Sequence, residues 1–162
     1  MQDWELIPDF TRYSVSEDGR IRNDDTGRIL RQVTMPDGRM KVGLMRSGIQ
    51  YTRVVSRLVM HAFVPNRDPY RSDTPIHLDG RLDNCAAYNL AWRPRWFAKT
   101  HTRQFKLGAP DTPPIRNLDT GETYAGVWEL VCKYGLLRSD VLECVGKDWP
   151  VYPLMQRFDW LE

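Results

Sequence analysis

The stretch from residue 55 to residue 92 constrains the fold more than any other part of the chain. A proline-rich loop divides it, and the segment IHLDG at 76–80 follows, where Asp-Gly predicts a tight turn after a short strand. Asn84 and the segment NLAW at 89–92 complete the stretch. Before the loop, apolar residues at helical spacing predict a short amphipathic helix: Leu58, Val59, Ala62 and Phe63. A helix, a strand ending at a histidine and a closing segment must therefore pack within a short span.

This order of residues resembles the core of HNH nucleases, specifically the phage and intron-encoded homing endonuclease family. The residues that carry the resemblance are Arg-Leu-Val at 57–59, Phe63, His-x-Asp-Gly at 77–80, Asn84 and Asn-Leu-x-Trp at 89–92. The resemblance implies a small ββα-metal core that acts on double-stranded DNA with Mg²⁺ or another divalent cation. Two residues would then belong to the catalytic site: His77 as the general base that takes a proton from water, and Asn84, which stiffens its loop.

The metal-ligand positions depart from the family pattern. The residue before the base is usually Asp or Asn, and here it is Ile76. The ligand expected in the closing helix is replaced by Ala98, and His101 lies almost one helical turn further along. We therefore assign the metal site to Asn89, His101 and Asp79. Because isoleucine and alanine offer no lone pair to a cation, the departures count against cleavage. The alternative is a catalytically inactive HNH-derived protein with a structural or protein-interaction role, for instance in a phage particle.

The first 54 residues predict a β-rich segment. Asp18-Gly19 between two β-prone runs predicts a hairpin. Three further runs, at 29–33, 40–45 and 51–55, are separated by turn residues and predict a three-stranded meander. Trp4 and the residues at 13–22 also resemble the motif that precedes the core in many phage homing endonucleases, so two motifs occur in the family's order.

The segment from 93 to 106 is the most basic stretch of the chain and contains no acidic residue. Bound beside a duplex, it would release counterions from phosphates and supply affinity that does not depend on sequence. The residues predicted to contact DNA are Arg93, Arg95, Lys99, Arg103 and Lys106. The alternative is a solvated basic helix, with its aromatic residues in the core in either case. The meander carries a second basic cluster that is open to the same two interpretations: Arg31, Arg39, Lys41, Arg46 and Arg53.

The segment GAPDTPP at 108–114 predicts a linker, because prolines stop helices and stiffen extended chain. The module at 115–162 then predicts a hairpin at 115–124 and helices at 127–134 and 139–145, a helix-turn-helix-like arrangement. It resembles the small DNA-binding repeat at the C-termini of intron-encoded nucleases. Its second helix has two acidic residues and only one late lysine, so a protein-contact module is an equal alternative to a DNA-reading one.

Length and composition bound the remaining possibilities. The chain has 162 residues and a formal net charge of +2, which suits one ordinary domain or a few small modules. Its three cysteines are widely spaced without a CxxC pair, so we expect reduced thiols. We expect no membrane span, no signal peptide and no nucleotide cofactor. The expected location is the cytoplasm of the host cell, with virion association as a further expectation for a phage-encoded protein.

The expected fold class is α+β, with four consecutive parts. An N-terminal β-rich motif at 1–54 precedes an HNH-like core with its basic helix at 55–107. The linker at 108–114 then leads to the helix-turn-helix-like module at 115–162.

Overall fold

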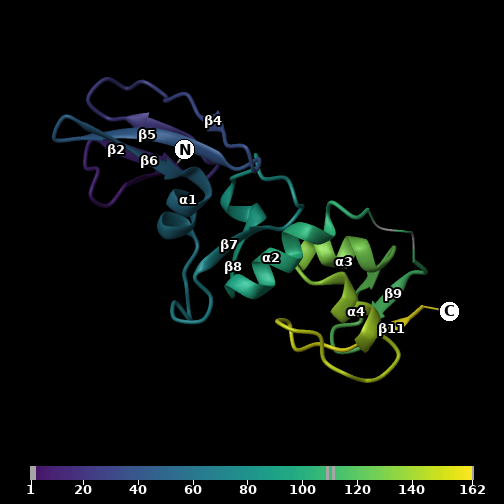
Figure 1. Cartoon of the computed structure of the whole chain (residues 1–162). Helices are drawn as coiled ribbons and strands as arrows, with labels where there is room; N and C mark the ends of the chain where they lie inside the picture. Colours follow the sequence, from purple (N-terminus) through teal and green to yellow (C-terminus); the bar gives the residue numbers. More distant parts are fainter. Residues whose placement is uncertain (1–2, 109, 111, 162) are drawn as a thin grey trace. The chain divides into compact units, whose positions relative to one another are not determined.

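The computed structural model describes residues 3–108, 110 and 112–161. The chain folds into two compact units. Unit 1 comprises Met1–His77 and Arg81–Pro94, and unit 2 comprises Leu78–Gly80 and Arg95–Glu162. Figure 1 labels the helices and strands of both units. Residues 109 and 111 of the predicted linker lie outside the described part of the chain.

The first sheet of unit 1 contains the predicted N-terminal hairpin. Strands β1 (Trp4–Leu6), β2 (Tyr13–Ser16) and β3 (Ile21–Asn23) form an antiparallel sheet in the order β1-β2-β3. The turn between β2 and β3 uses Gly19 at φ +89°, a left-handed conformation that glycine adopts without steric penalty. The prediction of a hairpin around Asp18-Gly19 is therefore confirmed.

The second sheet of unit 1 is the predicted meander, with a shorter first strand. Strands β4 (Val33–Thr34), β5 (Met40–Arg46) and β6 (Ile49–Val54) pair antiparallel in the order β4-β5-β6. The prediction of a first strand over 29–33 was wrong, because Ile29 pairs with Arg22 of β3 in an isolated bridge. The backbone N–H of Leu30 also donates to the carbonyl of Ile21, so this segment extends the first sheet.

Helix α1 (Val55–Phe63) follows β6 directly and confirms the predicted amphipathic helix. Its apolar face packs on both sheets, as Figure 1 shows for the helix below β5 and β6. The largest completely buried side chains of this core come from the two sheets and α1: Ile21, Leu44, Val55, Val59 and Met60. Strands β7 (Thr74–His77) and β8 (Leu90–Arg93), with the 3₁₀ turn η1 (Ala87–Asn89) before β8, form a small antiparallel sheet.

Unit 2 combines the basic helix with the C-terminal module. Helix α2 (Arg95–Gln104) precedes β9 (Ile115–Asn117) and β10 (Thr123–Tyr124), which pair with β11 (Phe158–Trp160) in the order β10-β9-β11. Helices α3 (Val127–Tyr134) and α4 (Arg138–Cys144) are joined through Gly135 in the left-handed region. The predicted helix pair is confirmed, with its second helix starting one residue earlier. No helix in the described ranges is long and apolar enough to cross a membrane.

Gln104 ties the end of α2 to the turn of the helix pair. Its Nε2 donates to the carbonyl of Leu136 at 2.9 Å, and its Oε1 accepts from the backbone N–H of Arg138 at 2.9 Å. Both backbone groups lie at the junction between α3 and α4, where helix ends leave such groups without helical partners. One side chain therefore anchors the basic helix to the helix pair within unit 2.

Candidate functional site

The predicted general base lies at the end of β7 in unit 1. His77 pairs with Leu90 of β8, and Ile76 pairs with Ala91. Because successive side chains of a strand alternate between faces, Ile76 and His77 point in opposite directions. Both are buried, with exposed fractions of 1% for Ile76 and 4% for His77. The sequence therefore places an apolar side chain in the core where the family usually has a ligand.

The thiol of Cys85 lies beside the His77 imidazole in unit 1. Its Sγ is 3.9 Å from Nε2 of His77. Burial raises the pKa of the Cys85 thiol to about 11, so the thiol is neutral at physiological pH. The carboxylate of Asp83 also belongs to this loop, and a hydrogen bond from Arg81 lowers its pKa. His77 thus has a neutral thiol as a direct neighbour and an ionised carboxylate in the same loop.

Two asparagines fix the loop between β7 and β8. Asn89 is buried, and its Nδ2 donates to the carbonyl of Asn84 at 2.9 Å. The side chain of Asn84 itself reaches the hydroxyl of Tyr88 at 3.5 Å, and its backbone N–H donates to the carbonyl of Arg81. Loop stiffening by an asparagine side chain was expected for both residues, and the Asn89 side chain makes such a bond to the loop backbone. The catalytic role of Asn84 and the ligand role of Asn89 stay predictions.

The other two predicted ligands, Asp79 and His101, belong to unit 2. His101 is buried on α2, where its ring stacks on Phe97 at a centroid distance of 6.3 Å and meets the edge of Phe105 at 5.1 Å. Asp79 is half-buried in the turn before Gly80. An aromatic enclosure is the usual surrounding of a packed core histidine. The assignment of Asp79 and His101 as ligands stays a prediction.

Within each unit, the described residues do not gather the side chains that usually hold a divalent cation. No group of three or more His, Cys, Asp or Glu side chains within the described ranges is arranged to hold a metal ion. Ile76 and Ala98 stand at the two expected ligand positions, and both are buried apolar side chains. Mg²⁺ prefers near-octahedral oxygen ligands, usually one or two carboxylates with several waters. Among its described residues, neither unit by itself offers such a constellation.

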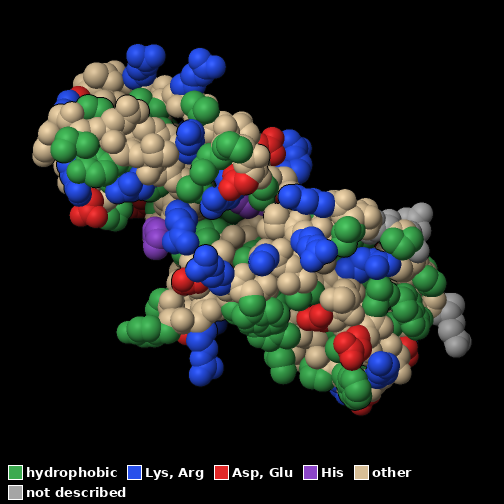
Figure 2. All heavy atoms as spheres, in the orientation of Figure 1, with side chains coloured by type: hydrophobic (Ala, Val, Ile, Leu, Met, Phe, Trp, Pro, Cys, Tyr) green, Lys and Arg blue, Asp and Glu red, His purple; other side chains and the backbone are tan. Residues whose placement is uncertain are grey.

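The basic residues of α2 form one exposed row in unit 2. Arg95, Lys99 and Arg103 follow one another at four-residue spacing, which places them along one side of the helix. Lys106, three residues after Arg103, continues the row. All four are exposed, and none makes a salt bridge in the part of the chain that the structure describes. Figure 2 shows blue side chains over this helix. We call these four residues the α2 basic row.

Arg93 is the one predicted DNA contact outside this row. It closes β8 in unit 1, is half-buried, and its Nη1 donates to the carbonyl of Trp92 at 2.9 Å. Arg93 is therefore half-buried and hydrogen-bonded to the backbone, whereas the four residues of the α2 basic row are exposed.

The basic cluster of the meander is largely engaged in packing. The guanidinium groups of Arg46 and Arg53 lie between 4.8 and 5.4 Å from the ring centroids of Phe10 and Tyr51. Arg39 pairs with Asp37 at 2.7 Å. Cation–π contacts and local ion pairs are the ordinary roles of such residues on a sheet. Of the two interpretations of this cluster, the structure favours sheet residues over a free phosphate-binding row.

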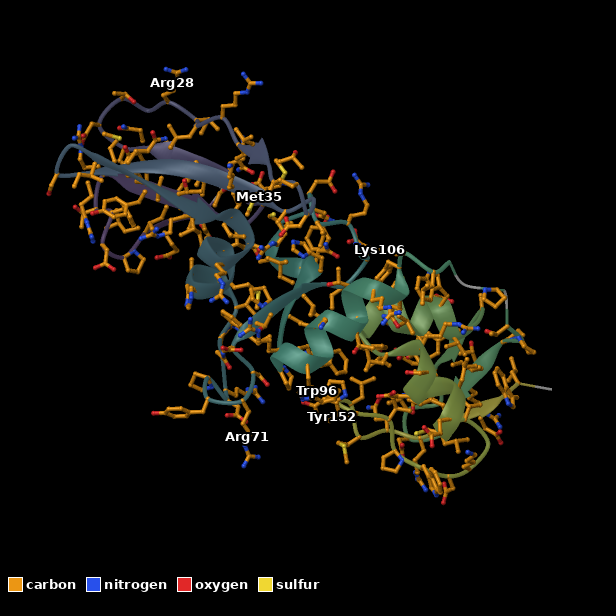
Figure 3. The ribbon with its side chains drawn as sticks, in the orientation of Figure 1. Arg28, Met35, Arg71, Trp96, Lys106 and Tyr152 are labelled. Atoms are coloured by element: carbon orange, nitrogen blue, oxygen red, sulfur yellow. The ribbon has the colours of Figure 1, made fainter. Side chains whose placement is uncertain are left out.

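The exposure of Trp96 differs from the expectation from sequence. Trp96 was expected in the core with the other aromatic residues of its segment, but its exposed fraction is 62%, whereas Phe97 is completely buried. Trp96 stacks on Tyr152 with ring centroids 6.4 Å apart and an interplanar angle of 27°, and Figure 3 shows the two labelled side chains together. The period of α2 gives the reason, because Trp96 shares its exposed side with Lys99 and Arg103.

Comparison with known proteins identifies the family. The NUMOD4 motif matches residues 3–44. Two proteins of Acanthamoeba polyphaga mimivirus, both named as uncharacterized HNH endonucleases, are 33% identical over 82% of this chain and 37% identical over 55% of it. The chain spans only 39% and 23% of their lengths. The structure of the HNH homing endonuclease I-HmuI, described with its DNA binding and cleavage, superposes with a TM-score of 0.58, 21% identity and 98% coverage of both chains.

The fold is thus the mixed helix and sheet fold of an HNH homing endonuclease. Together with the NUMOD4 motif and the two proteins named as HNH endonucleases, this fold supports the HNH homing endonuclease family that the sequence resembles. The family resemblance and the α+β fold predicted from the sequence are both confirmed.

Proposed function

We propose that this protein binds double-stranded DNA through its HNH-type fold, with the α2 basic row as a principal phosphate contact. The observation that carries the proposal is the row itself: three exposed cationic side chains along α2 and a fourth, Lys106, just after its end, without salt-bridge partners in the described part of the chain. Such a surface neutralises phosphates and releases their counterions, so its affinity depends on salt rather than on base sequence. The structural similarity to an HNH homing endonuclease supports DNA as the polyanion.

The proposal is tested by the salt dependence of binding to a fluorescein-labelled, mixed-sequence duplex, followed by fluorescence anisotropy. Each phosphate contact contributes about −0.9 to the slope of log K against log salt, so four contacts predict a slope of about −3.6 or steeper. A heparin-like polyanion and a single strand of the same sequence serve as comparisons. Absence of duplex binding at low salt, in a folded sample, would contradict the proposal and favour a structural or protein-interaction role.

We further propose that DNA binding is not coupled to efficient metal-dependent cleavage. The buried apolar side chains of Ile76 and Ala98 stand where the family places ligands, and their positions support this view. His77 by itself accepts a proton at best, since the charge that develops on a scissile phosphate requires a cation or an equivalent electrophile. Mg²⁺ bound to this protein on DNA would rely mainly on waters and on the DNA phosphate.

Incubation of supercoiled plasmid with the wild-type protein and with His77→Ala, in Mg²⁺ and in Mn²⁺, tests this second point. We expect the two proteins to produce nicked plasmid at the same background rate. Nicking by the wild-type protein that is lost in His77→Ala would overturn the proposal and establish an HNH-type nuclease with His77 as its base. Asn84→Ala serves as a further variant, because its loss of nicking would assign the second predicted catalytic residue.

A further inference from the structure

A fixed loop projects from unit 1 between α1 and β7. Hydrogen bonds among its own residues close it. Asn66 Nδ2 donates to the carbonyl of Ser72 at 2.7 Å, and the backbone N–H of Asp68 donates to Asn66 Oδ1 at 3.0 Å. The backbone N–H groups of Ser72 and Arg71 also donate to the carbonyl of Asp68. Figure 1 shows the segment extending away from α1 before it returns to β7. Residues 66–72 therefore have a defined conformation before any ligand binds.

The tip of this loop carries an aromatic ring between two cations. Tyr70 is 98% exposed, the highest fraction among the large hydrophobic residues that the structure describes. Arg67 and Arg71 are exposed as well and take part in no salt bridge in the described part of the chain. Figure 3 shows Arg71 pointing away from the ribbon. Asp68 is exposed as well, and its Oδ1 accepts from the backbone N–H of Arg71 at 3.3 Å.

A single exposed hydrophobic residue is ordinary on a protein surface and indicates nothing by itself. Here the ring stands on a loop that hydrogen bonds hold in place, so little conformational entropy is lost when it binds. A tyrosine also offers a large contact area with few rotatable bonds. Its two neighbouring guanidinium groups add the charge that a phosphate backbone attracts. The loop also leads at once into β7, which begins at Thr74 and ends at His77.

We propose that the 66–72 loop is a wedge for double-stranded DNA. The ring of Tyr70 inserts at a base step and stacks on an opened base, and Arg67 and Arg71 bind the phosphates on either side. Aromatic and apolar side chains that enter a step in this way unstack it and kink the duplex, and the loss of stacking is offset by a larger contact surface. The proposal rests on the DNA binding proposed above, and it assigns a position on unit 1 where the duplex is deformed.

The experiment compares the wild-type protein with Tyr70→Ala and Tyr70→Phe. Stacking of one base on an aromatic ring corresponds to about a 5- to 150-fold change in affinity on substitution by alanine. We expect Tyr70→Ala to weaken duplex binding within that range and Tyr70→Phe to bind within about twofold of wild type, because the stacking ring remains. A duplex labelled with donor and acceptor dyes at its ends should show increased energy transfer, the sign of a kink, with wild type and Tyr70→Phe only.

The arginines are tested separately by salt dependence. Changing Arg67 and Arg71 together to glutamine should make the slope of log K against log salt shallower by about 1.8, two phosphate contacts at about 0.9 each. Arg28→Gln is the matched control, since Arg28 is an exposed arginine of the same unit that Figure 3 places on a different loop. The Arg28→Gln variant should leave the energy transfer unchanged. It should lower the affinity only by the small amount that the loss of one distant charge causes.

The outcomes separate this inference from the proposed function. Equal affinity and equal energy transfer for wild type and Tyr70→Ala would overturn the wedge and leave DNA binding intact. No duplex binding by the wild-type protein would overturn both. Because Tyr70 is almost completely exposed, Tyr70→Ala should retain the wild-type thermal unfolding midpoint, and circular dichroism checks that the variant is folded.

Discussion

Replacing Gly80 with alanine is expected to lower the free energy of unfolding by about 2–5 kcal/mol. Gly80 has φ +74°, where an L-residue is strained by about 1–2 kcal/mol. A Cβ at this position would also lie 2.3 Å from two ring carbons of Phe105, so the ring must move. Forcing atoms into a packed site of this kind costs about 1–3 kcal/mol. The measurement is chemical denaturation of the purified variant and wild type.

Gly121→Ala provides the matched control for the Gly80 prediction. Gly121 has φ +80° and belongs to the same unit, but a Cβ there would meet nothing within 4 Å. It should therefore show the backbone strain alone, about 1–2 kcal/mol. A further test places Gly80→Ala in a Phe105→Ala background. There the Gly80→Ala substitution should be less destabilising than it is in the wild-type protein. Equal effects of Gly80→Ala in both backgrounds would contradict the role of the Phe105 ring.

Local signals in the sequence predicted the elements of this fold well. The hairpin at Asp18-Gly19, helix α1 and the pair α3 and α4 all follow from turn residues or from apolar spacing that is satisfied within a few residues. The error at Ile29 concerns the pairing partner, because that residue bridges back to Arg22, seven residues earlier, and so extends the first sheet. Propensity alone contains no information about which partner strand a short β-prone run will find.

The candidate site shows the same contrast between features that local sequence predicts and features that depend on packing. Motif matches placed His77 at the end of a strand and Asn89 at the start of the closing segment, and both positions follow from order along the chain. They could not show that Cys85 lies 3.9 Å from His77, or that the His101 ring lies between Phe97 and Phe105. These contacts depend on how loops and helices pack, so the same residue types fit a catalytic site and a packed core.

The packing of Trp96 and of the meander arginines follows from periodicity once the element boundaries are known. The α2 period separates exposed Trp96 from buried Phe97, and the pleat of β5 and β6 brings Arg46 and Arg53 onto the face that carries Tyr51. An error of one residue in a boundary would reverse such an assignment. The sequence therefore predicts securely which segments are basic. It predicts less securely which of their charged side chains pack against other residues and which are exposed.

Neutralising the α2 basic row is expected to produce the largest change in DNA binding. The variant carries Arg95→Gln, Lys99→Gln, Arg103→Gln and Lys106→Gln, which remove four charges and keep side chains that favour helix. If each residue contacts one phosphate, the slope of log K against log salt becomes shallower by about 3.6. Between about 50 and 200 mM salt, the affinity of the wild-type protein then falls about 150-fold further than that of the variant. Fluorescence anisotropy with a labelled duplex measures both slopes.

A pair of double variants distinguishes a local contact from a general effect of net charge. Arg103→Gln with Lys106→Gln removes two charges from the α2 basic row, and Arg116→Gln with Lys147→Gln removes two exposed charges elsewhere in unit 2. The first pair should make the slope shallower by about 1.8, whereas the second should leave it almost unchanged, because distant charges release few counterions. Equal changes from both pairs would contradict α2 as the contact surface. A larger effect of the second pair would assign the DNA contact to the C-terminal module, where Lys147 is the late lysine that follows α4.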